Sequence, residues 1–349
     1  MTTAYTTHPR FTEHDLPSHP EHAGRIRAVW RALEDAGLTE RMASLPITPA
    51  SDEDILAVHT ADHLNLLKKL ETLTTTVRLD PDTYATPTSA ELARYAAGAV
   101  ITGVDAVLRG QAGNALAAVR PPGHHAEPGA AMGFCLLSNI AIAARNAQRT
   151  HGVGKIMILD YDVHHGNGTE AAFYDDPSVL FISLHQGENA YGGPFYPGTG
   201  AVTDIGAGKG TGTTLNIPLS PGHGDASYEA LFKQVVIPAA RRFSPELILV
   251  SAGFDSHWLD PLAGIRLSLT GYDALTRMLI ALAGELCSGR IAFVMEGGYN
   301  LEALSGGIAN IARALLGESE AVDPLGLPPD ASPPDITPLL AQLRDIHRL

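Results

Sequence analysis

A buried strand that runs into carboxylates and imidazoles is the feature that most constrains this sequence. Residues 155–159 suit a β-strand, and they are followed directly by Asp160-Tyr161-Asp162-Val163-His164 and by a glycine-rich turn at 166–168. Side chains alternate along a strand, so residues two apart point to the same side. Buried carboxylates are costly without a partner, whereas two carboxylate oxygens and a neutral imidazole can bind a divalent metal ion. The pattern predicts that Asp162 and His164 are metal ligands.

Short apolar strands alternate with helices along most of the chain. This alternation implies right-handed βαβ crossovers and an α/β fold with a mostly parallel central sheet and helices on both faces. We expect a single domain over residues 1–323, and a proline-rich extension over 324–349 that packs on this domain or trails from it. The predicted strands are 115–119, 155–159, 179–184, 213–217, 247–251 and 291–295, and the predicted helices are 23–36, 61–73, 89–108, 136–149, 226–242, 272–286 and 301–316.

The composition narrows the class of protein. The 349 residues are 45% hydrophobic and carry a net charge of −14, which allows a sizeable core and argues against nucleic acid as a partner. Two cysteines, Cys135 and Cys287, make no disulfide framework, so a reducing cytoplasm is expected. The sequence shows neither a signal-peptide pattern nor an apolar run of about 20 residues. We therefore expect a cytoplasmic protein without membrane attachment.

Polar residues gather after the carboxyl ends of the predicted strands. Ligands of open α/β sheets bind at this edge. Asp255 also follows an apolar strand, where Gly253 is expected to let the backbone turn sharply. Asp162, His164 and Asp255 would be three protein ligands with one open position, which is typical of catalytic zinc. In the alternative interpretation, the two aspartates only cap helices or turns. The polar clusters lie at 120–125, 160–165, 185, 255–257 and 296–299.

Two adjacent histidines, His124 and His125, follow the strand at 115–119 in a loop that prolines and a glycine should fix. Neutral histidine is the usual general base at about pH 7, and its protonated form can act as the general acid. Asp160 and Asn167 would tune the two rings differently, because an ionised partner raises a histidine pKa more than an amide does. The alternative is a histidine pair that is simply hydrogen-bonded within its loop.

Aromatic residues accompany the polar loops. Tyr299 follows two glycines after the strand at 291–295, so its hydroxyl could donate to the oxyanion of a tetrahedral intermediate. Gly133-Phe134 and Tyr196 could line a narrow tunnel to the same edge. Packing roles for Tyr299, Phe134 and Tyr196 are the alternative.

With these residues in view, the chain resembles the histone deacetylase superfamily, closest to its class II and bacterial amidohydrolase branch. Asn167, where class I members carry aspartate, and the Gly-Gly-Tyr loop both favour class II. The matching segments follow the family order along nearly the whole chain, at 19–25, 120–126, 133–135, 160–168, 183–185, 195–200, 251–255, 260–262 and 296–300.

The resemblance implies the arginase/deacetylase fold and a catalytic Zn²⁺ that polarises an amide carbonyl and the attacking water. It also implies a structural K⁺. The residues that the resemblance assigns to Zn²⁺ are Asp162, His164 and Asp255, and those near K⁺ are Asp160, Ser183 and Leu184.

The resemblance also implies roles for the remaining polar residues. His125, paired with Asn167, would take the proton of the water, and His124, paired with Asp160, would protonate the leaving amine. Tyr299 would complete the oxyanion site. How the two histidines divide the acid and base roles is left open.

The expected substrate is an acyl-lysine peptide or protein, or a similar small acylated amine. Gly133, Phe134 and Tyr196 would flank the acyl-lysine stem, with Tyr196 standing where phenylalanine is common. Acetylpolyamine deacetylation is the alternative, although polyamine-selective relatives carry glutamate where Leu262 stands. The oligomeric state is left open, and a homo-oligomer is compatible with the sequence.

The sequence argues against two other functions. A catalytically silent protein that binds an acyl ligand or a metal would be expected to lack Tyr299 or one of the tandem histidines, and all are present. An arginase-like ureohydrolase would carry a further aspartate two positions after His164, and that position is Gly166. The sequence therefore predicts one catalytic metal ion rather than two.

Overall fold

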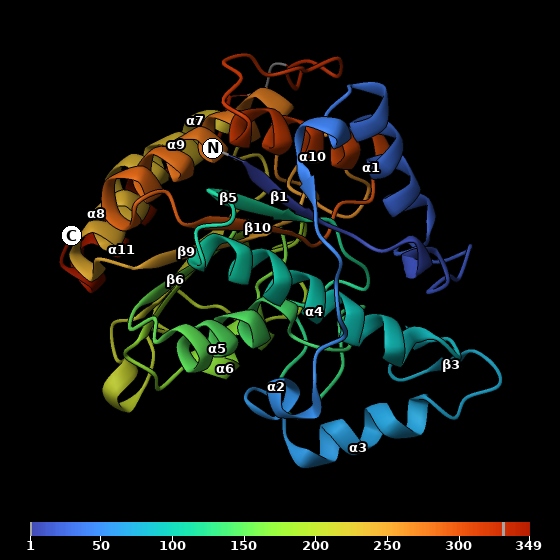
Figure 1. Cartoon of the computed structure of the whole chain (residues 1–349). Coiled ribbons are helices and arrows are strands. Elements are labelled where there is room, and N and C mark those ends of the chain that lie inside the picture. The colour runs from blue at the N-terminus through green and yellow to red at the C-terminus, as the bar shows by residue number, and fades with distance from the viewer. Residues whose placement is uncertain (1, 330–331) are drawn as a thin grey trace.

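Every pairing in the central sheet is parallel, as the alternation of strands and helices predicted. The computed structural model describes residues 2–329 and 332–349 (Figure 1). Within them the order of the sheet is β2-β1-β5-β10-β9-β6-β7-β8. The strands are β1 (Thr3–Thr6), β2 (Ala43–Ser44), β5 (Asn114–Ala117), β6 (Ile156–Asp160), β7 (Val179–Gln186), β8 (Thr214–Leu219), β9 (Leu247–Ala252) and β10 (Ile291–Met295), and a small antiparallel pair is formed by β3 (Val77–Arg78) and β4 (Tyr84–Ala85).

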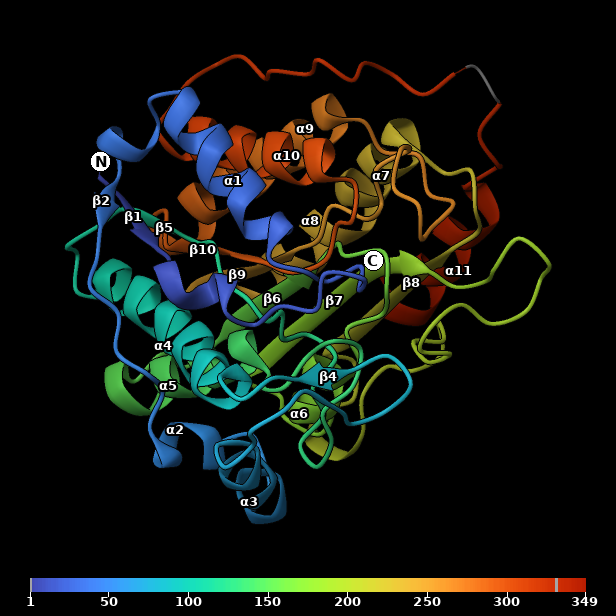
Figure 2. The ribbon, with the colours of Figure 1, turned by 90° about the vertical axis from the view of Figure 1, so that its right-hand side faces the viewer.

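Helices cover both faces of this sheet (Figures 1 and 2). One layer contains α1 (Gly24–Asp35), α7 (Asp225–Leu231), α8 (Ile237–Phe243), α9 (Leu269–Cys287) and α10 (Leu301–Leu315). The opposite layer contains α4 (Ser89–Leu108), α5 (Asn139–His151) and α6 (Asn167–Phe173), and α2 (Asp52–Leu56) and α3 (Ala61–Leu70) lie beyond α4 and α5. The strands β6, β7, β9 and β10 are buried along their whole length, so the core lies on both faces of the sheet.

The order of the strands brings distant loops together. The chain leaves β5 and forms β6, β7 and β8 farther out, and β9 and β10 then fill the gap between β5 and β6. Because all four strands β5, β10, β9 and β6 are parallel, the loops after them meet at one edge of the sheet. These loops carry the tandem histidines, Tyr299, Asp255 and the pair Asp162 and His164.

Each predicted strand and helix is present, with boundaries that differ by a few residues. The predicted helix at 226–242 is divided, because a π-helical turn, η4 (Phe232–Val236), separates α7 from α8. Pro238 at the start of α8 lacks the N–H of a regular helical hydrogen bond, which accounts for the irregular turn. Strand β1 was missed because Thr3-Ala4-Tyr5-Thr6 is short and half polar.

The extension after α10 crosses the layer formed by α7, α9 and α10 and ends in a helix, α11 (Thr337–His347), that was not predicted (Figure 2). Asn310 exchanges two hydrogen bonds with the backbone of Val322, at 2.9 and 3.0 Å. The buried side chain of Leu343 attaches α11 to the core. In the part of the chain that is described, no helix combines the length and the apolar character needed to cross a membrane.

Two helical glycines, one tightly packed and one in open space, allow the packing around the helices to be tested by the same substitution. A Cβ atom at Gly98 in α4 would lie 1.8 Å from the carbonyl oxygen of Thr48, whereas a Cβ atom at Gly284 in α9 would meet nothing within 4 Å. We expect Gly98→Ala to lower the free energy of unfolding by about 1–3 kcal/mol through overpacking. Gly284→Ala should raise it by about 0.5–1 kcal/mol, because alanine is the better helix former. Urea unfolding of both variants tests this, and equal effects would contradict the packing.

A second prediction concerns the pH dependence of stability. Burial, with the Arg242 guanidinium nearby, lowers the pKa of His347 from 6.5 to about 4. Because the unfolded chain takes up this proton first, the contribution of His347 to the free energy of unfolding should fall as the pH drops from 6.5 to about 4, and this contribution should level off outside that window. Urea unfolding at a series of pH values measures it. His347→Gln should remove this component, and an unchanged pH profile would contradict the assignment.

Candidate active site

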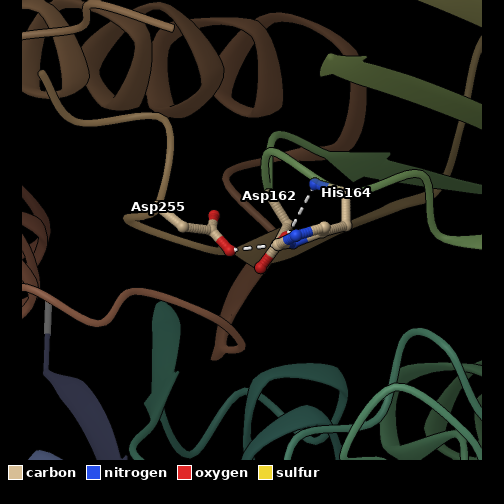
Figure 3. Close-up of side chains that lie close together, drawn as sticks. All are labelled: Asp162, His164 and Asp255. Carbon is tan, nitrogen blue, oxygen red and sulfur yellow. Dashed lines mark hydrogen bonds and ion pairs between the residues drawn. The ribbon is translucent and has the colours of Figure 1, made fainter. Parts of the chain in front are cut away.

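Asp162, His164 and Asp255 converge at the sheet edge from the loops after β6 and β9 (Figure 3). Their potential ligand atoms all lie within 4.8 Å of one another. Nδ1 of His164 lies 3.2 Å from Oδ1 of Asp162 and 3.1 Å from Oδ2 of Asp255. Both carboxylates are completely buried. Among the described residues, this is the group of three whose atoms could hold a metal ion.

Hydrogen bonds to the backbone orient these side chains. Strand β6 ends at Asp160, so regular strand alternation does not reach His164. Instead, the N–H of His164 donates to Oδ1 of Asp162 at 3.0 Å. The N–H of Val163 donates to Oδ1 of Asp255 at 2.9 Å, which ties the two loops together. The two predicted ligands do meet, but a folded loop brings them together rather than the strand.

Two glycines leave the room that the carboxylates occupy. A Cβ atom at Gly253 would lie 2.1 Å from Oδ2 of Asp162, and one at Gly297 would lie 2.3 Å from Oδ2 of Asp255. The expected sharp turn at Gly253 is therefore not the reason for that glycine, which lies outside the left-handed region. Gly297 also donates its N–H to Oδ2 of Asp162 at 2.8 Å.

The electrostatics of the cluster favour a cation. Burial, together with the neighbouring Asp162 carboxylate, raises the pKa of Asp255 to about 7. Burial disfavours a charged His164, but its hydrogen bonds to Asp162 and Asp255 outweigh burial and raise the pKa of His164 to about 9. Ligand atoms about 2.0–2.1 Å from a tetrahedral zinc ion would be about 3.3 Å apart, close to the 3.1 and 3.2 Å found here. The donor set and its spacing fit zinc.

The tandem histidines lie beside this cluster with different partners. Nδ1 of His124 is 3.0 Å from Oδ2 of Asp160, and Nδ1 of His125 is 2.8 Å from Oδ1 of Asn167. Burial opposes a charge on His124, but the carboxylates of Asp162 and Asp160 raise its pKa well above the ordinary range. Burial and the neighbouring His124 hold the pKa of His125 well below that range. The two imidazoles thus have different partners: carboxylates favour the charged form of His124, whereas burial and His124 favour the neutral form of His125.

Tyr299 is held at the cavity by two residues whose contacts the sequence did not reveal. Oδ2 of Asp260 accepts the N–H of Tyr299 at 2.7 Å, and Oδ1 of Asp260 accepts the N–H of Leu262 at 3.0 Å. The guanidinium of Arg25 lies 5.1 Å from the centre of the Tyr299 ring and donates to the carbonyl of Gly298 at 2.8 Å. One buried carboxylate thereby fixes Tyr299 and Leu262 relative to each other.

Glu296 supports the loop that carries the histidines. Its Oε2 accepts the N–H groups of Gly123 and His124 at 2.7 and 3.2 Å, and its Oε1 accepts the hydroxyl of Ser251 at 3.2 Å. Burial raises the pKa of Glu296 to about 7. The sequence placed this residue among the polar loops but gave no sign of its partners, because these belong to other strands.

A cavity of about 300 Å³ leads from the surface to the histidines. Phe195, the neighbour of Tyr196 in the aromatic run at 195–200, also lines it, and its ring stacks on that of His164 with the centroids 5.1 Å apart. The Tyr196 ring meets that of His125 edge-on at 5.3 Å. The predicted tunnel residues all contribute to the wall, which consists of Pro20, Asp82, His125, Gly133, Phe134, His164, Phe195, Tyr196, Leu262 and Tyr299.

Comparisons with known proteins agree with this arrangement. A family profile described as the histone deacetylase domain matches residues 19–315. Histone deacetylase 14, chloroplastic, from Arabidopsis thaliana is 44% identical over 321 residues, which cover 87% of this chain and 74% of the relative. The histone deacetylase-like amidohydrolase of Pseudomonas aeruginosa is 44% identical over 281 residues, covering 80% and 72% of the two chains.

The fold is also similar to that of a solved protein structure. The crystal structure of the HDA15 HD domain superposes with a TM-score of 0.90 at 36% sequence identity, covering 99% of this chain and 95% of that one. The family profile, the relatives and the superposed structure together span the sheet, both helical layers and the cavity. The chain therefore belongs to the histone deacetylase family.

Proposed function

We propose that this protein is a zinc-dependent deacylase that removes acetyl or related acyl groups from lysine side chains or similar primary-amine amides. The observation that carries the proposal is the meeting of three groups at one cavity: the Asp162–His164–Asp255 cluster, the tandem histidines and Tyr299. Relatives named as histone deacetylases and as a deacetylase-like amidohydrolase support the same reaction class.

Zinc held by Asp162, His164 and Asp255 would polarise the acyl carbonyl and lower the pKa of the attacking water. Burial and the neighbouring His124 lower the pKa of His125 and favour its neutral form, whose Nε2 can take the proton from the water. His124 lies 3.0 Å from Asp160, and the neighbouring carboxylates raise its pKa and favour its charged form, which can stabilise negative charge and supply a proton to the leaving amine.

Tyr299 would donate its hydroxyl to the oxygen that becomes negative in the tetrahedral intermediate. Burial raises the pKa of Tyr299 well above its ordinary value, so the phenol keeps the proton that it donates. Asp260 and Arg25 hold the loop of this residue, which lowers the cost of ordering the donor during the reaction.

We also propose a K⁺ site, a catalytic domain over residues 1–323 and a cytoplasmic location. K⁺ would bind near Asp160, Ser183 and Leu184, where β6 and β7 place Asp160 opposite Ser183. Residues 1–323 would form the catalytic domain, with 324–349 as an extension of it. Cys135 and Cys287 are both buried and free, which is consistent with the cytoplasm.

The primary test is release of acetate from an acetyl-lysine peptide by the zinc-loaded protein. Tyr299→Phe removes one hydroxyl from the cavity, and loss of an oxyanion donor typically lowers kcat by about 100- to 1,000-fold. Tyr174→Phe, at the end of α6, makes the same chemical change outside the cavity and should leave kcat unchanged. Full activity of Tyr299→Phe would contradict the mechanism, and an inactive zinc-loaded wild type would favour a silent binding protein.

Leu262 offers a test of the substrate class. It lines the mouth of the cavity with 38% of its surface exposed, so the cavity wall is apolar at this position. We expect the wild type to have a higher kcat/KM for an acetyl-lysine peptide than for acetylputrescine. Leu262→Glu adds a carboxylate that attracts a free ammonium, and a partly exposed pair worth about 0.5–1 kcal/mol should shift the ratio about 2- to 5-fold towards acetylputrescine.

Leu327→Glu is the matched control for that experiment, because Leu327 is 69% exposed and lies in the extension away from the cavity. It should leave the ratio of the two kcat/KM values unchanged. If the wild type prefers acetylputrescine, the polyamine alternative replaces acyl-lysine as the substrate class.

A further inference from the structure

Asn167 connects His125 to the carboxylate of Glu127, which has no part in the proposed reaction. Its Oδ1 lies 2.8 Å from Nδ1 of His125, and its Nδ2 donates to Oε1 of Glu127 at 2.8 Å. Nδ2 also lies 3.3 Å from the sulfur of Met132, a weak acceptor. The three side chains of His125, Asn167 and Glu127 therefore form a continuous chain from the cavity to the half-buried glutamate.

The chemistry of an amide makes this chain directional. The oxygen of an asparagine only accepts hydrogen bonds and its nitrogen only donates them. Oε1 of Glu127 is the acceptor in this contact, so it requires the nitrogen of Asn167 to face it. The oxygen of Asn167 must then face His125, whose Nδ1 has to carry the hydrogen. The Nε2 lone pair of His125 is thereby left free for the reaction.

Glu127 is itself held in place. Its N–H donates to the carbonyl of Ala130 at 3.0 Å, and its own carbonyl accepts from Nδ1 of His59 at 3.0 Å. Nε2 of His59 accepts the N–H of Ser138 at 3.0 Å, which fixes the tautomer that donates to Glu127. The carboxylate is thus attached to a short, well-bonded segment rather than to a free surface loop.

We propose that Glu127 is a positioning residue that fixes the amide orientation of Asn167 and, through it, the Nδ1–H tautomer of His125. This inference rests on the proposed function, because it gives His125 the lone pair that the general base needs. In the competing interpretation, Glu127 only stabilises its loop. The two interpretations predict different effects of changing Glu127 when Asn167 is replaced by aspartate, whose two oxygens both accept hydrogen bonds.

Exchanging the hydrogen-bond donors and acceptors at positions 127 and 167 distinguishes the two interpretations. Glu127→Lys replaces an acceptor by a donor, which favours turning the oxygen of Asn167 away from His125. Asn167→Asp accepts from His125 in either orientation, but it places a carboxylate at hydrogen-bonding distance from Glu127, and like charges repel. In the double variant, the introduced carboxylate can accept from both the introduced ammonium and His125. Each single change should therefore impair the enzyme, and the two together should restore it.

The experiment measures kcat/KM for an acetyl-lysine peptide with the zinc-loaded proteins. Each single variant should lose about 10- to 100-fold, as is typical when a residue that orients a catalytic side chain is removed. The double variant should recover at least about tenfold over either single variant, which corresponds to a coupling of about 1.4 kcal/mol. Glu320→Lys, on the exposed surface after α10, changes the net charge equally and should have no effect.

Losses that simply multiply in the double variant would overturn the inference, because a loop-stabilising glutamate would not be rescued by Asn167→Asp. A second measurement does not depend on activity. In ¹⁵N-histidine-labelled protein, His125 should carry its hydrogen on Nδ1 in the wild type and in the double variant, and should shift towards Nε2–H in Glu127→Lys. An unchanged tautomer in Glu127→Lys would also overturn the inference, whereas an inactive wild type with the expected tautomers would overturn only the proposed function.

Discussion

The convergence of two buried carboxylates and one imidazole on a single point is the constraint on which the rest of this structure depends. Asp162 and Asp255 are completely buried and share His164 at 3.2 and 3.1 Å. Two such charges would repel each other strongly without a cation between them. The sheet order places β9 beside β6, so that both loops end at this point, and Gly253 and Gly297 leave room for the carboxylate oxygens. The donor groups and the space around the cluster thus fit a positive ion.

Further buried carboxylates hold the surrounding loops, and they differ in whether backbone N–H groups or arginine side chains are their partners. Glu296 and Asp260 accept backbone N–H groups from loops that follow different strands. Glu21 instead pairs with two buried arginines, with Nη2 of Arg120 at 2.7 Å and Nη1 of Arg25 at 3.1 Å. Burial opposes the charge of Glu21, but the Arg120 guanidinium outweighs it and holds the pKa well below the usual range. Because breaking such a buried arrangement leaves an uncompensated charge, these residues make the geometry of the site rigid.

The sequence was sufficient to predict the fold class, and the structure brings His125, His164, Tyr299 and the predicted tunnel residues together in the wall of one cavity. Strand ends are visible in a sequence because apolar runs stop at polar residues, and all parallel strands place those ends at one edge. The order of the strands was not predictable, since nothing local in β9 indicates that it inserts beside β6. For the same reason the distant partners of Asp260 could not be foreseen, because two of its three hydrogen bonds reach Tyr299 and Asn300, 39 and 40 residues farther along the chain. The helix α11 was missed because it follows a proline-rich stretch that resembles a tail.

We expect one catalytic metal ion, bound where Asp162, His164 and Asp255 meet. Gly166 stands where a second, bridging carboxylate would be needed, and a Cβ atom there would lie 2.3 Å from Oδ2 of Asp160, so the structure leaves no room for a larger side chain. The most direct test combines metal analysis of the purified protein with anomalous diffraction at the zinc edge. We expect one zinc ion per chain, bound by Asp162, His164 and Asp255. Two ions in this site, or a single ion bound by other residues, would contradict it.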